Sequence, residues 1–600
     1  MDTRTKLAGM GAILHDEGVA FRVWAPNAET VAVVGDFNNW EHERNVMERE
    51  GEGYWYADVP GAKVGDEYQF AIRRGEQSLL RNDPYAREMT NSAGNSVIAD
   101  TAFDWGEDAF TLANHNELVI YEMHVGTFHR ETADQVGTFD GVRKKLDYLK
   151  WLGVNAIQIM PSAEFAGDLS WGYNPAHIFA VESAYGGPVG LKQLVKAAHE
   201  AGIGVIMDVV YNHFGPSDLD LWQFDGWSEN GQGGIYFYND WRAETPWGQT
   251  RPDYGRGEVR QFIRDNAMMW IDEFHMDGLR FDMTLFIRSV DGSDERSIPE
   301  GWTLAQWINR DVRSRSGNKI TIAEDLRTNP AITADESYGG ANFSSQWDEQ
   351  VVHPLRQVVT ALDDGQRDME SVSRALQYRY NLDAFGRVVY SESHDEVANG
   401  KKRVPSEIHE QDPDGWHARR RSSLAAVMVF TAPGIPMIFQ GQEFLEDGWF
   451  QDSDPIDWQA AGEEDEVMRL YRDLIALRLN RTGQTTGLTG QHIEVRHVNH
   501  LDQVVAFRRW MHGGPGDETI VVANFSHRDW SDYRIGFPGQ GAWQVRFDSS
   551  SSYYAGDFEG AGISEVLVSD QPYDNYPHSG SFPLRPYSAL ILSMDRSQVA

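Results

Sequence analysis

The chain has 600 residues, with 53 lysines and arginines against 91 aspartates and glutamates, and a formal net charge of −38. Such an acidic surface repels phosphate backbones and anionic membranes, which argues against nucleic acid and membrane partners. The sequence contains no cysteine, so disulfides and thiolate metal sites are excluded. A chain of this length predicts roughly two to four domains.

The amino-terminal part reads as a β-domain. Residues 17–75 carry short alternating apolar segments separated by Gly, Pro and Asn, which predicts a β-sandwich. We assign this domain to residues 1–105. Residues 1–4 lack the basic and apolar layout of a secretory signal, and no apolar stretch approaches the roughly 18 residues that span a bilayer. We therefore expect a cytoplasmic protein.

From about residue 117 the pattern changes to short apolar runs separated by amphipathic segments such as 190–201 and 259–274. Continuous apolar runs indicate strands buried on both faces, as in a parallel sheet covered by helices. Eight units of this kind predict an α/β domain with a (β/α)₈ TIM barrel at residues 106–485, with a short insertion near 215–255. A doubly wound sheet is the alternative. The expected strands are 118–123, 156–160, 205–210, 278–281, 320–323, 346–347, 388–390 and 436–439.

The last hundred residues return to β alternation, for example at 504–508, 519–522 and 589–592. We assign residues 486–600 to a carboxy-terminal all-β domain, expected to be a β-sandwich.

Four acidic residues follow the ends of predicted barrel strands. They are Asp208, Asp282, Glu324 and Asp395. The carboxyl ends of barrel strands meet at one face, where such folds place their chemistry. A single acid after a strand is usually a helix cap, but four on one rim, beside an arginine and two histidines, favour a catalytic site.

Two such carboxyl groups fit the cleavage of a glycosidic bond. A retaining mechanism needs a carboxylate nucleophile and a protonated acid roughly 5–5.5 Å apart. Arg280, two residues before Asp282, points to the same side of its strand and is expected to lower the pKa of that aspartate. Neighbouring carboxylates should keep the second acid protonated by like-charge repulsion.

At these residues the sequence resembles glycoside hydrolase family 13, the α-amylase family. Residues 208–213, 278–282, 322–325 and 394–395 resemble its four conserved regions in order. The resemblance covers nearly the whole chain. It implies that Asp282 is the nucleophile, that Glu324 is the general acid/base and that Asp395 is the transition-state stabiliser.

The same resemblance implies residues that bind the substrate. Arg280, His213 and His394 would contact the sugar at subsite −1, and Asp208 would brace the arginine. Tyr121 and Tyr173 are candidate sugar-contacting tyrosines.

Several segments narrow the choice within the family. Residues 21–28 and 34–40 resemble the glycogen-binding-type sandwich that accompanies branching, debranching and trehalose-releasing enzymes. Residues 393–397 and 400–402 resemble glucan branching enzymes.

Other segments resemble maltooligosyltrehalose trehalohydrolases, namely 160–165, 171–173 and 245–248. Those hydrolases usually carry glutamine in place of Glu396, and branching enzymes usually carry paired glutamates where Glu324 and Asp325 stand. We prefer a branching enzyme, followed by a trehalohydrolase and then an endo-acting α-amylase. An inactive glucan-binding barrel is disfavoured because all three catalytic acids are present.

We expect no cofactor and no metal. Calcium is not favoured: Asn212 stands where many α-amylases bind it, but the insertion at 215–255 is short for a calcium-holding domain. The expected partner is an α-1,4-glucan or maltooligosaccharide substrate, with the protein a monomer or weak oligomer.

Overall fold

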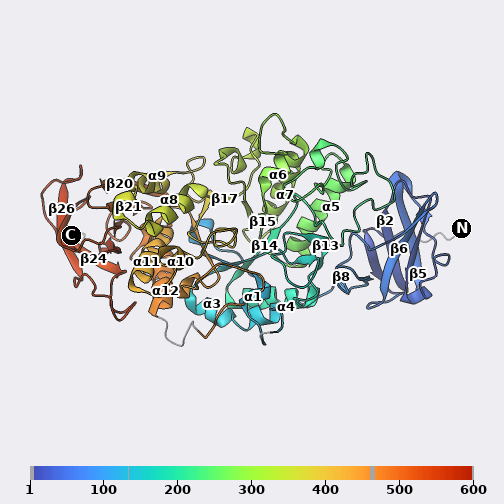
Figure 1. Ribbon diagram of the computed structural model, residues 1–600, viewed down its shortest axis with the longest axis horizontal. Coiled ribbons are helices and arrows are strands. Elements are labelled where there is room, and N and C mark those ends of the chain that lie inside the picture. The colour runs from blue at the N-terminus through green and yellow to red at the C-terminus, as the bar shows by residue number, and fades with distance from the viewer. Residues whose placement is uncertain (1–5, 133, 460–465, 597–600) are drawn as a thin grey trace.

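The computed structural model describes residues 6–132, 134–459 and 466–596. An amino-terminal β-domain, a central barrel and a carboxy-terminal β-domain follow one another along the long axis, with the chain ends at opposite poles (Figure 1). Residues 1–4, whose composition is unlike a secretory signal, lie outside the described part. No helix within that part is long and apolar enough to cross a membrane. The predicted domain boundaries stay predictions.

The amino-terminal domain consists of two antiparallel sheets, with strand orders β1-β2-β5-β4 and β3-β6-β9-β8, and β7 pairs with β6. The predicted sandwich is confirmed. Phe21 and Trp24 are buried in its core, and Phe21 packs on Tyr68 with ring centroids 5.0 Å apart. Burial of Phe21 and Trp24 therefore stabilises the domain. The strands are β1 (Gly11–His15), β2 (Gly18–Trp24), β3 (Thr30–Gly35), β4 (Glu48–Arg49), β5 (Tyr54–Pro60), β6 (Glu67–Arg74), β7 (Gln77–Arg81), β8 (Glu88–Met89) and β9 (Ser96–Val97).

The central domain is a closed barrel of eight parallel strands, ordered β10-β11-β14-β15-β16-β17-β18-β19, which confirms the predicted TIM barrel. Pairing of β10 with β19 closes it. Every residue of these strands is buried, as continuous apolar runs predict. The strands are β10 (Ile120–Met123), β11 (Ala156–Ile159), β14 (Gly204–Val209), β15 (Gly278–Phe281), β16 (Ile320–Ala323), β17 (Ser345–Trp347), β18 (Arg387–Val389) and β19 (Ile435–Phe439).

Helices connect the barrel strands and surround the barrel. The connection from β16 to β17 is the exception, because its described residues form only short 3₁₀ turns, Pro330–Ile332 and Glu336–Tyr338. The connection from β11 to β14 carries an extra hairpin of β12 (Ala163–Phe165) and β13 (Pro175–Val181), which the sequence did not predict. The helices are α1 (Val125–Phe128), α2 (Phe139–Arg143), α3 (Leu146–Leu152), α4 (Gly187–Ala201), α5 (Gly257–Met268), α6 (Thr284–Arg288), α7 (Pro299–Arg313), α8 (Glu349–Thr360), α9 (Met369–Gln377), α10 (Val404–Ile408), α11 (Trp416–Thr431) and α12 (Glu466–Arg478).

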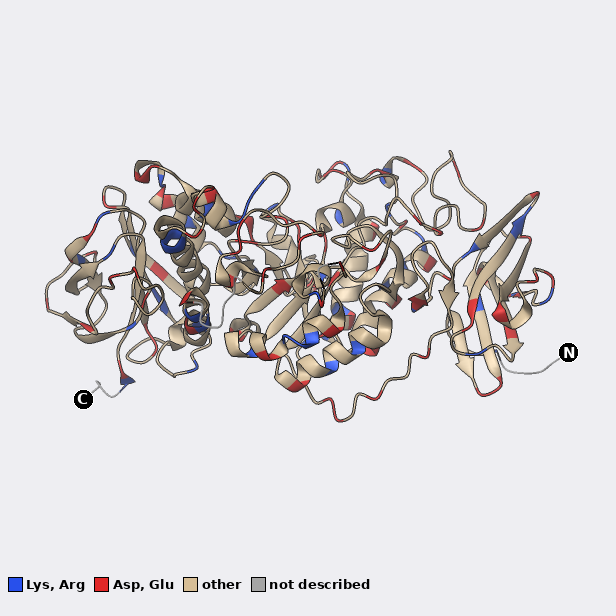
Figure 2. Cartoon of the chain, turned by 60° about the horizontal axis from the view of Figure 1, so that its bottom comes forward, with Lys and Arg blue, Asp and Glu red and all other residues tan. Residues whose placement is uncertain are grey.

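The segment between sandwich and barrel is fastened along the amino-terminal end of the barrel strands. Asp108 accepts hydrogen bonds from His199 at 3.0 Å and from His275 at 2.7 Å. Lys192 donates to the carbonyl of Thr101 at 2.7 Å. These contacts lie at the end of the barrel opposite its carboxyl face. Acidic residues are spread over all three parts of the molecule (Figure 2).

The sandwich also packs on the insertion that follows β14. The amide of Asn27 donates to Asp225 at 2.8 Å, and Trp24 packs edge-on against Tyr236. The amino-terminal domain therefore supports a loop that belongs to the catalytic face.

The carboxy-terminal domain has a six-stranded sheet, β20-β21-β22-β27-β24-β25, and a two-stranded sheet of β23 and β26. The predicted all-β domain is confirmed. The three predicted strands fall within β21, β22 and β27. The strands are β20 (His492–Asn499), β21 (Val504–Trp510), β22 (Thr519–Asn524), β23 (Trp530–Phe537), β24 (Gly541–Asp548), β25 (Glu565–Val568), β26 (His578–Leu584) and β27 (Ser588–Ser593).

A buried ion pair at the start of β18 gives a test of the fold. Arg387 and Asp348 are both fully buried and lie 3.0 Å apart. Removing the arginine leaves an unpaired buried carboxylate, which costs about 3–5 kcal/mol. Arg387→Met should therefore lower the apparent thermal midpoint in scanning calorimetry by several degrees. Arg310→Met, which breaks an exposed pair with Glu336, is the control and should leave the midpoint nearly unchanged.

Candidate active site

A buried arginine brings the predicted acids together at the carboxyl end of the barrel. Arg280 Nη1 lies 2.6 Å from Asp208 Oδ2 and 3.2 Å from Asp282 Oδ1, and Nη2 lies 2.7 Å from Glu324 Oε2. The guanidinium also lies 4.3 Å from the ring centroid of Trp347. Four of the predicted site residues thus form one cluster.

The strand ladder fixes where the two central acids lie. Asp282 and Glu324 each follow the last residue of a strand, yet the parallel hydrogen bonding continues through them. The amide of Asp282 donates to the carbonyl of Val209 at 3.0 Å, and the amide of Glu324 donates to that of Phe281 at 3.0 Å. Both side chains are therefore carried on rigid backbone at the rim.

The chain turns sharply after Asp282. Met283 has a φ of 37°, in the left-handed region that costs energy for a residue other than glycine. This turn directs the Met283 amide at Glu324 Oε2, which accepts its hydrogen bond at 3.0 Å.

The surroundings set the protonation of the two acids. Burial raises the pKa of Glu324 to about 7; the charges of Asp282 and Asp395 act in the same direction, and Arg280 opposes them. Burial also raises the pKa of Asp282, although Arg280 and a hydrogen bond from Asn212 oppose the rise. Arg280 lowers the pKa of Asp282, as expected, but desolvation outweighs the guanidinium and the net shift of the pKa is upward.

Asn212 and His213 lie directly behind Asp282. Asn212 Nδ2 donates to Asp282 Oδ2 at 2.7 Å, and its Oδ1 accepts from His213 Nδ1. Burial lowers the pKa of His213 to about 4, so the ring is neutral near pH 7. The amide considered for calcium therefore contacts the predicted nucleophile. Within residues 6–132, 134–459 and 466–596, no group of three or more His, Asp or Glu residues is arranged to hold a metal ion.

His394 is held by an acid that the sequence reasoning missed. Its Nδ1 lies 2.7 Å from Glu122 Oε1, and its amide donates to Glu122 Oε2 at 3.0 Å. Burial alone would lower the pKa of His394, but the carboxylate of Glu122 more than offsets this and raises it. Glu122 comes from the middle of β10 and points into the barrel.

Tyr121, the neighbour of Glu122, is not brought to the site. Its ring is fully buried on the opposite side of β10, and its hydroxyl donates to Glu443 Oε1 at 2.8 Å. Successive residues of a strand face opposite ways, so Glu122 and Tyr121 cannot both point into the barrel. The predicted sugar contact of Tyr121 is therefore wrong.

Tyr173 does reach the cluster. Its hydroxyl donates to Asp208 at 2.7 Å, and its ring stacks on His394 with centroids 5.1 Å apart and an interplanar angle of 24°. The edge of Trp171 also contacts His394, with centroids 5.7 Å apart. An aromatic wall, of which only Tyr173 was predicted, thus flanks the acids.

Asp395 is partly exposed at the mouth and accepts a hydrogen bond from Asn399 at 2.7 Å. Its charge contributes to the raised pKa of Glu324, so it is electrostatically coupled to that acid. Glu396, the next residue, instead pairs with Lys401 at 2.9 Å.

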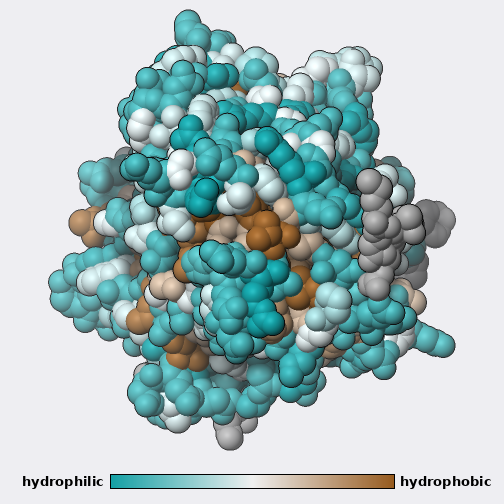
Figure 3. Space-filling view, turned by 90° about the vertical axis from the view of Figure 1, so that its right-hand side faces the viewer, coloured by the Kyte–Doolittle hydropathy of each residue, from teal (hydrophilic) through white to brown (hydrophobic). Residues whose placement is uncertain are grey.

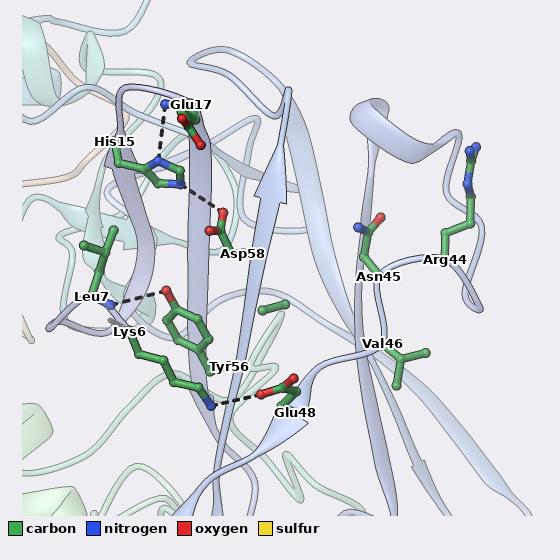
Figure 4. Close-up of a pocket in the computed structure, with 11 residues that line it drawn as sticks. Lys6, Leu7, His15, Glu17, Arg44, Asn45, Val46, Glu48, Tyr56 and Asp58 are labelled. Carbon is green, nitrogen blue, oxygen red and sulfur yellow. Dashed lines mark hydrogen bonds and ion pairs between the residues drawn. The ribbon is translucent and has the colours of Figure 1, made fainter. Parts of the chain in front are cut away.

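A separate cavity of about 470 Å³ lies on the amino-terminal sandwich (Figure 4). His15 and Asp58 form one contact on its wall at 3.0 Å, and Lys6 and Glu48 form another at 3.3 Å. None of the predicted site residues lines it. From this end of the molecule the surface is mostly hydrophilic around a central hydrophobic area (Figure 3).

Comparisons with protein-family models match three parts of the chain. Carbohydrate-binding module 48 (isoamylase N-terminal domain) matches residues 9–86. The α-amylase catalytic domain matches residues 123–242 and 222–476, and the α-amylase C-terminal all-β domain matches residues 495–595.

Curated relatives match over nearly the full chain. The 1,4-alpha-glucan branching enzyme GlgB of Salinibacter ruber is 30% identical over 619 residues, covering 97% of this chain and 96% of that protein. The protein of the same name from Corynebacterium jeikeium is 32% identical over 592 residues, covering 92% and 78%.

Solved structures share the fold. Type I pullulanase from Bacillus subtilis has a TM-score of 0.77 at 20% identity, covering 98% of this chain and 86% of that one. The catalytic module of the glycogen-degrading pneumococcal virulence factor SpuA has a TM-score of 0.76 at 20% identity, covering 99% and 98%.

A (β/α)₈ barrel with clustered acids at its carboxyl face, joined to a carbohydrate-binding type of module, defines an α-glucan-active enzyme. The chain belongs to the α-amylase family, glycoside hydrolase family 13.

Replacing the two central acids tests their predicted roles. Asp282→Asn should reduce turnover of amylose by more than about 1,000-fold, because a neutral amide cannot form a glycosyl ester. Glu324→Gln should reduce it by about 10²–10⁴-fold, the range for loss of a general acid. On α-maltooligosyl fluorides, whose leaving group needs no proton, the Glu324→Gln loss should be much smaller. Equal losses on both substrates would contradict the acid role, and unchanged thermal midpoints serve as the folding control.

The raised pKa of Glu324 predicts an alkaline limit of activity. The protonated form predominates below about pH 7 and is lost as pH rises through that value, so kcat/KM on amylose should fall tenfold per pH unit above it. With an α-maltooligosyl fluoride, whose leaving group needs no proton, the rate of fluoride release should not fall above pH 7. A flat kcat/KM profile on amylose up to pH 9 would contradict the assignment.

Proposed function

We propose that the chain is a 1,4-α-glucan branching enzyme, which cleaves α-1,4 links and transfers the released chain to form α-1,6 branches. The observation that carries this proposal is the similarity to branching enzymes along the whole chain, with 30% identity over 619 residues and nearly complete coverage of both proteins. The arrangement of the acids around Arg280 supplies the chemistry.

In the first step Asp282 attacks the anomeric carbon of the sugar at subsite −1. The bond to the leaving oxygen breaks while Glu324 donates its proton to that oxygen, so one chain departs with a free 4-hydroxyl. A covalent glycosyl ester on Asp282 remains. Close placement of the two acids supports this retaining route, since both carboxyl groups contact the guanidinium of Arg280.

In the second step Glu324, now ionised, takes the proton from the 6-hydroxyl of an acceptor chain. The acceptor oxygen attacks the anomeric carbon and releases Asp282. One α-1,4 bond is broken and one α-1,6 bond is formed, and no water is consumed.

The neighbouring residues bind and orient the reacting sugar in this scheme. His394, held in place by Glu122, and Asp395 would donate to and accept from sugar hydroxyls at subsite −1. Tyr173 would offer its ring to the sugar, and Asp208 would keep Arg280 in place.

Two other reactions use the same intermediate. A maltooligosyltrehalose trehalohydrolase would release trehalose, and an endo-acting α-amylase would let water replace the acceptor. The resemblance of residues 171–173 and 245–248 to trehalohydrolases keeps that enzyme as the second candidate.

Product analysis with amylose separates the three. A branching enzyme should lower iodine staining with almost no new reducing ends, and debranching of the product should release short chains. An α-amylase would raise reducing ends in step with the loss of stain. Release of trehalose from maltooligosyltrehalose without new α-1,6 links would replace the proposal with the second candidate.

A further inference from the structure

A tryptophan on the insertion after β14 stacks on His213, which contacts Asp282 through Asn212, and has no part in the chemistry described above. Trp247 is 42% exposed. One face of its ring stacks on His213, with centroids 4.6 Å apart and an interplanar angle of 14°. Phe286 packs edge-on against it at 5.4 Å and 86°. An indole held flat and open to solvent beside an active site offers an apolar face to the C–H surface of a sugar ring.

The turn that carries Trp247 is closed by its own hydrogen bonds. The amide of Thr245 donates to the carbonyl of Gly248 at 2.8 Å, and that of Gly248 donates back at 3.2 Å. The amide of Trp247 donates to the Thr245 hydroxyl at 3.2 Å. Gly248 has a φ of 135°, which a residue with a side chain rarely adopts. The indole is therefore presented on a preformed turn.

A buried arginine fastens this turn to α6, the helix that follows Asp282 at the end of β15. Arg251 is fully buried and donates to carbonyls of the insertion at Arg242 and Glu244. It also donates to carbonyls at the end of α6, at Phe286 and at Ser289. With the sandwich packed on the insertion through Asn27 and Asp225, the insertion is held from both sides.

The position of Phe286 indicates which side of the scissile bond Trp247 serves. α6 begins at Thr284, directly after Met283, whose amide binds Glu324. Glu324 is the proposed proton donor to the leaving oxygen, so its side of the site receives the leaving chain and later the acceptor. Trp247 contacts α6 through Phe286 and thus borders that side.

We propose that Trp247 is the stacking platform for the acceptor glucan chain and favours transfer over hydrolysis. This inference rests on the proposed function. By stacking a sugar ring against the exposed part of its indole, Trp247 keeps an acceptor hydroxyl near the glycosyl ester and displaces water from it. Its effect should therefore fall on the second step and leave the first step nearly unchanged.

The test measures the two steps separately with an α-maltooligosyl fluoride as donor and maltohexaose as acceptor. Trp247→Ala should raise the acceptor KM about tenfold, the effect of losing one aromatic stacking contact. Fluoride release without acceptor should stay within about twofold of the wild type. Trp247→Phe should restore most of the acceptor binding. On amylose, Trp247→Ala should form more reducing ends for each α-1,6 link made.

Trp241→Ala is the matched control. Trp241 lies on the same insertion, is 52% exposed and contacts Arg296 rather than His213. Its replacement should leave both steps unchanged.

An unchanged acceptor KM in Trp247→Ala would overturn the inference. An equal loss of fluoride release and transfer would also overturn it, because Trp247 would then act by positioning His213 and Asn212 behind Asp282. A wild type that transfers without making α-1,6 links contradicts the branching proposal, while the acceptor comparison still decides the role of Trp247. A wild type with no transfer at all contradicts both.

Discussion

One buried guanidinium sets the electrostatics of the site. Arg280 is fully buried and contacts the carboxyl groups of Asp208, Asp282 and Glu324. One positive charge cannot balance three negative charges away from water, because an uncompensated buried charge costs on the order of several kcal/mol. Burial raises the pKa of Glu324 to about 7, and the charge of Asp282 adds to the rise, so a proton on Glu324 relieves part of this excess near neutral pH. Burial raises the pKa of Asp208 only to about 6, so that carboxylate is mostly ionised there. A site of this charge holds a protonated acid beside a carboxylate, which is the pair that a double displacement requires.

The rest of the fold holds that cluster on the barrel and borders it with a loop that is itself fastened in place. Parallel hydrogen bonding continues through Asp282 and Glu324, so the backbone position of both acids is fixed by the barrel sheet. The insertion that carries Trp247 is instead a loop, fastened by Arg251 and by the amino-terminal sandwich. In the proposed mechanism the barrel strands carry the reacting acids, and the insertion carries Trp247, the proposed acceptor platform.

The barrel and most of its acids could be predicted because strands buried on both faces leave continuous apolar runs, and the acids follow those runs directly. The direction of each side chain was harder to predict. In β10 the sequence offers Tyr121 and Glu122 side by side, and only the register of the closed barrel shows that Glu122 faces inward. Trp347, under Arg280, and Trp247, over His213, come from segments distant in sequence, so no local pattern could show these contacts. The β12–β13 hairpin was missed because β12, residues 163–165, is too short to show a strand periodicity, and a loop separates it from β13, residues 175–181.

The central claim is that Asp282 forms a covalent ester with the sugar while Glu324 donates a proton to the leaving oxygen and later accepts one from the acceptor. A maltooligosyl fluoride with a second fluorine at C5 of the reacting sugar slows release of the ester more than its formation. After incubation with this compound and proteolysis, mass spectrometry should find the glycosyl group on the peptide that contains Asp282, and fragmentation should place it on that residue. A label on any other residue, or no label while the compound is turned over, would contradict the account.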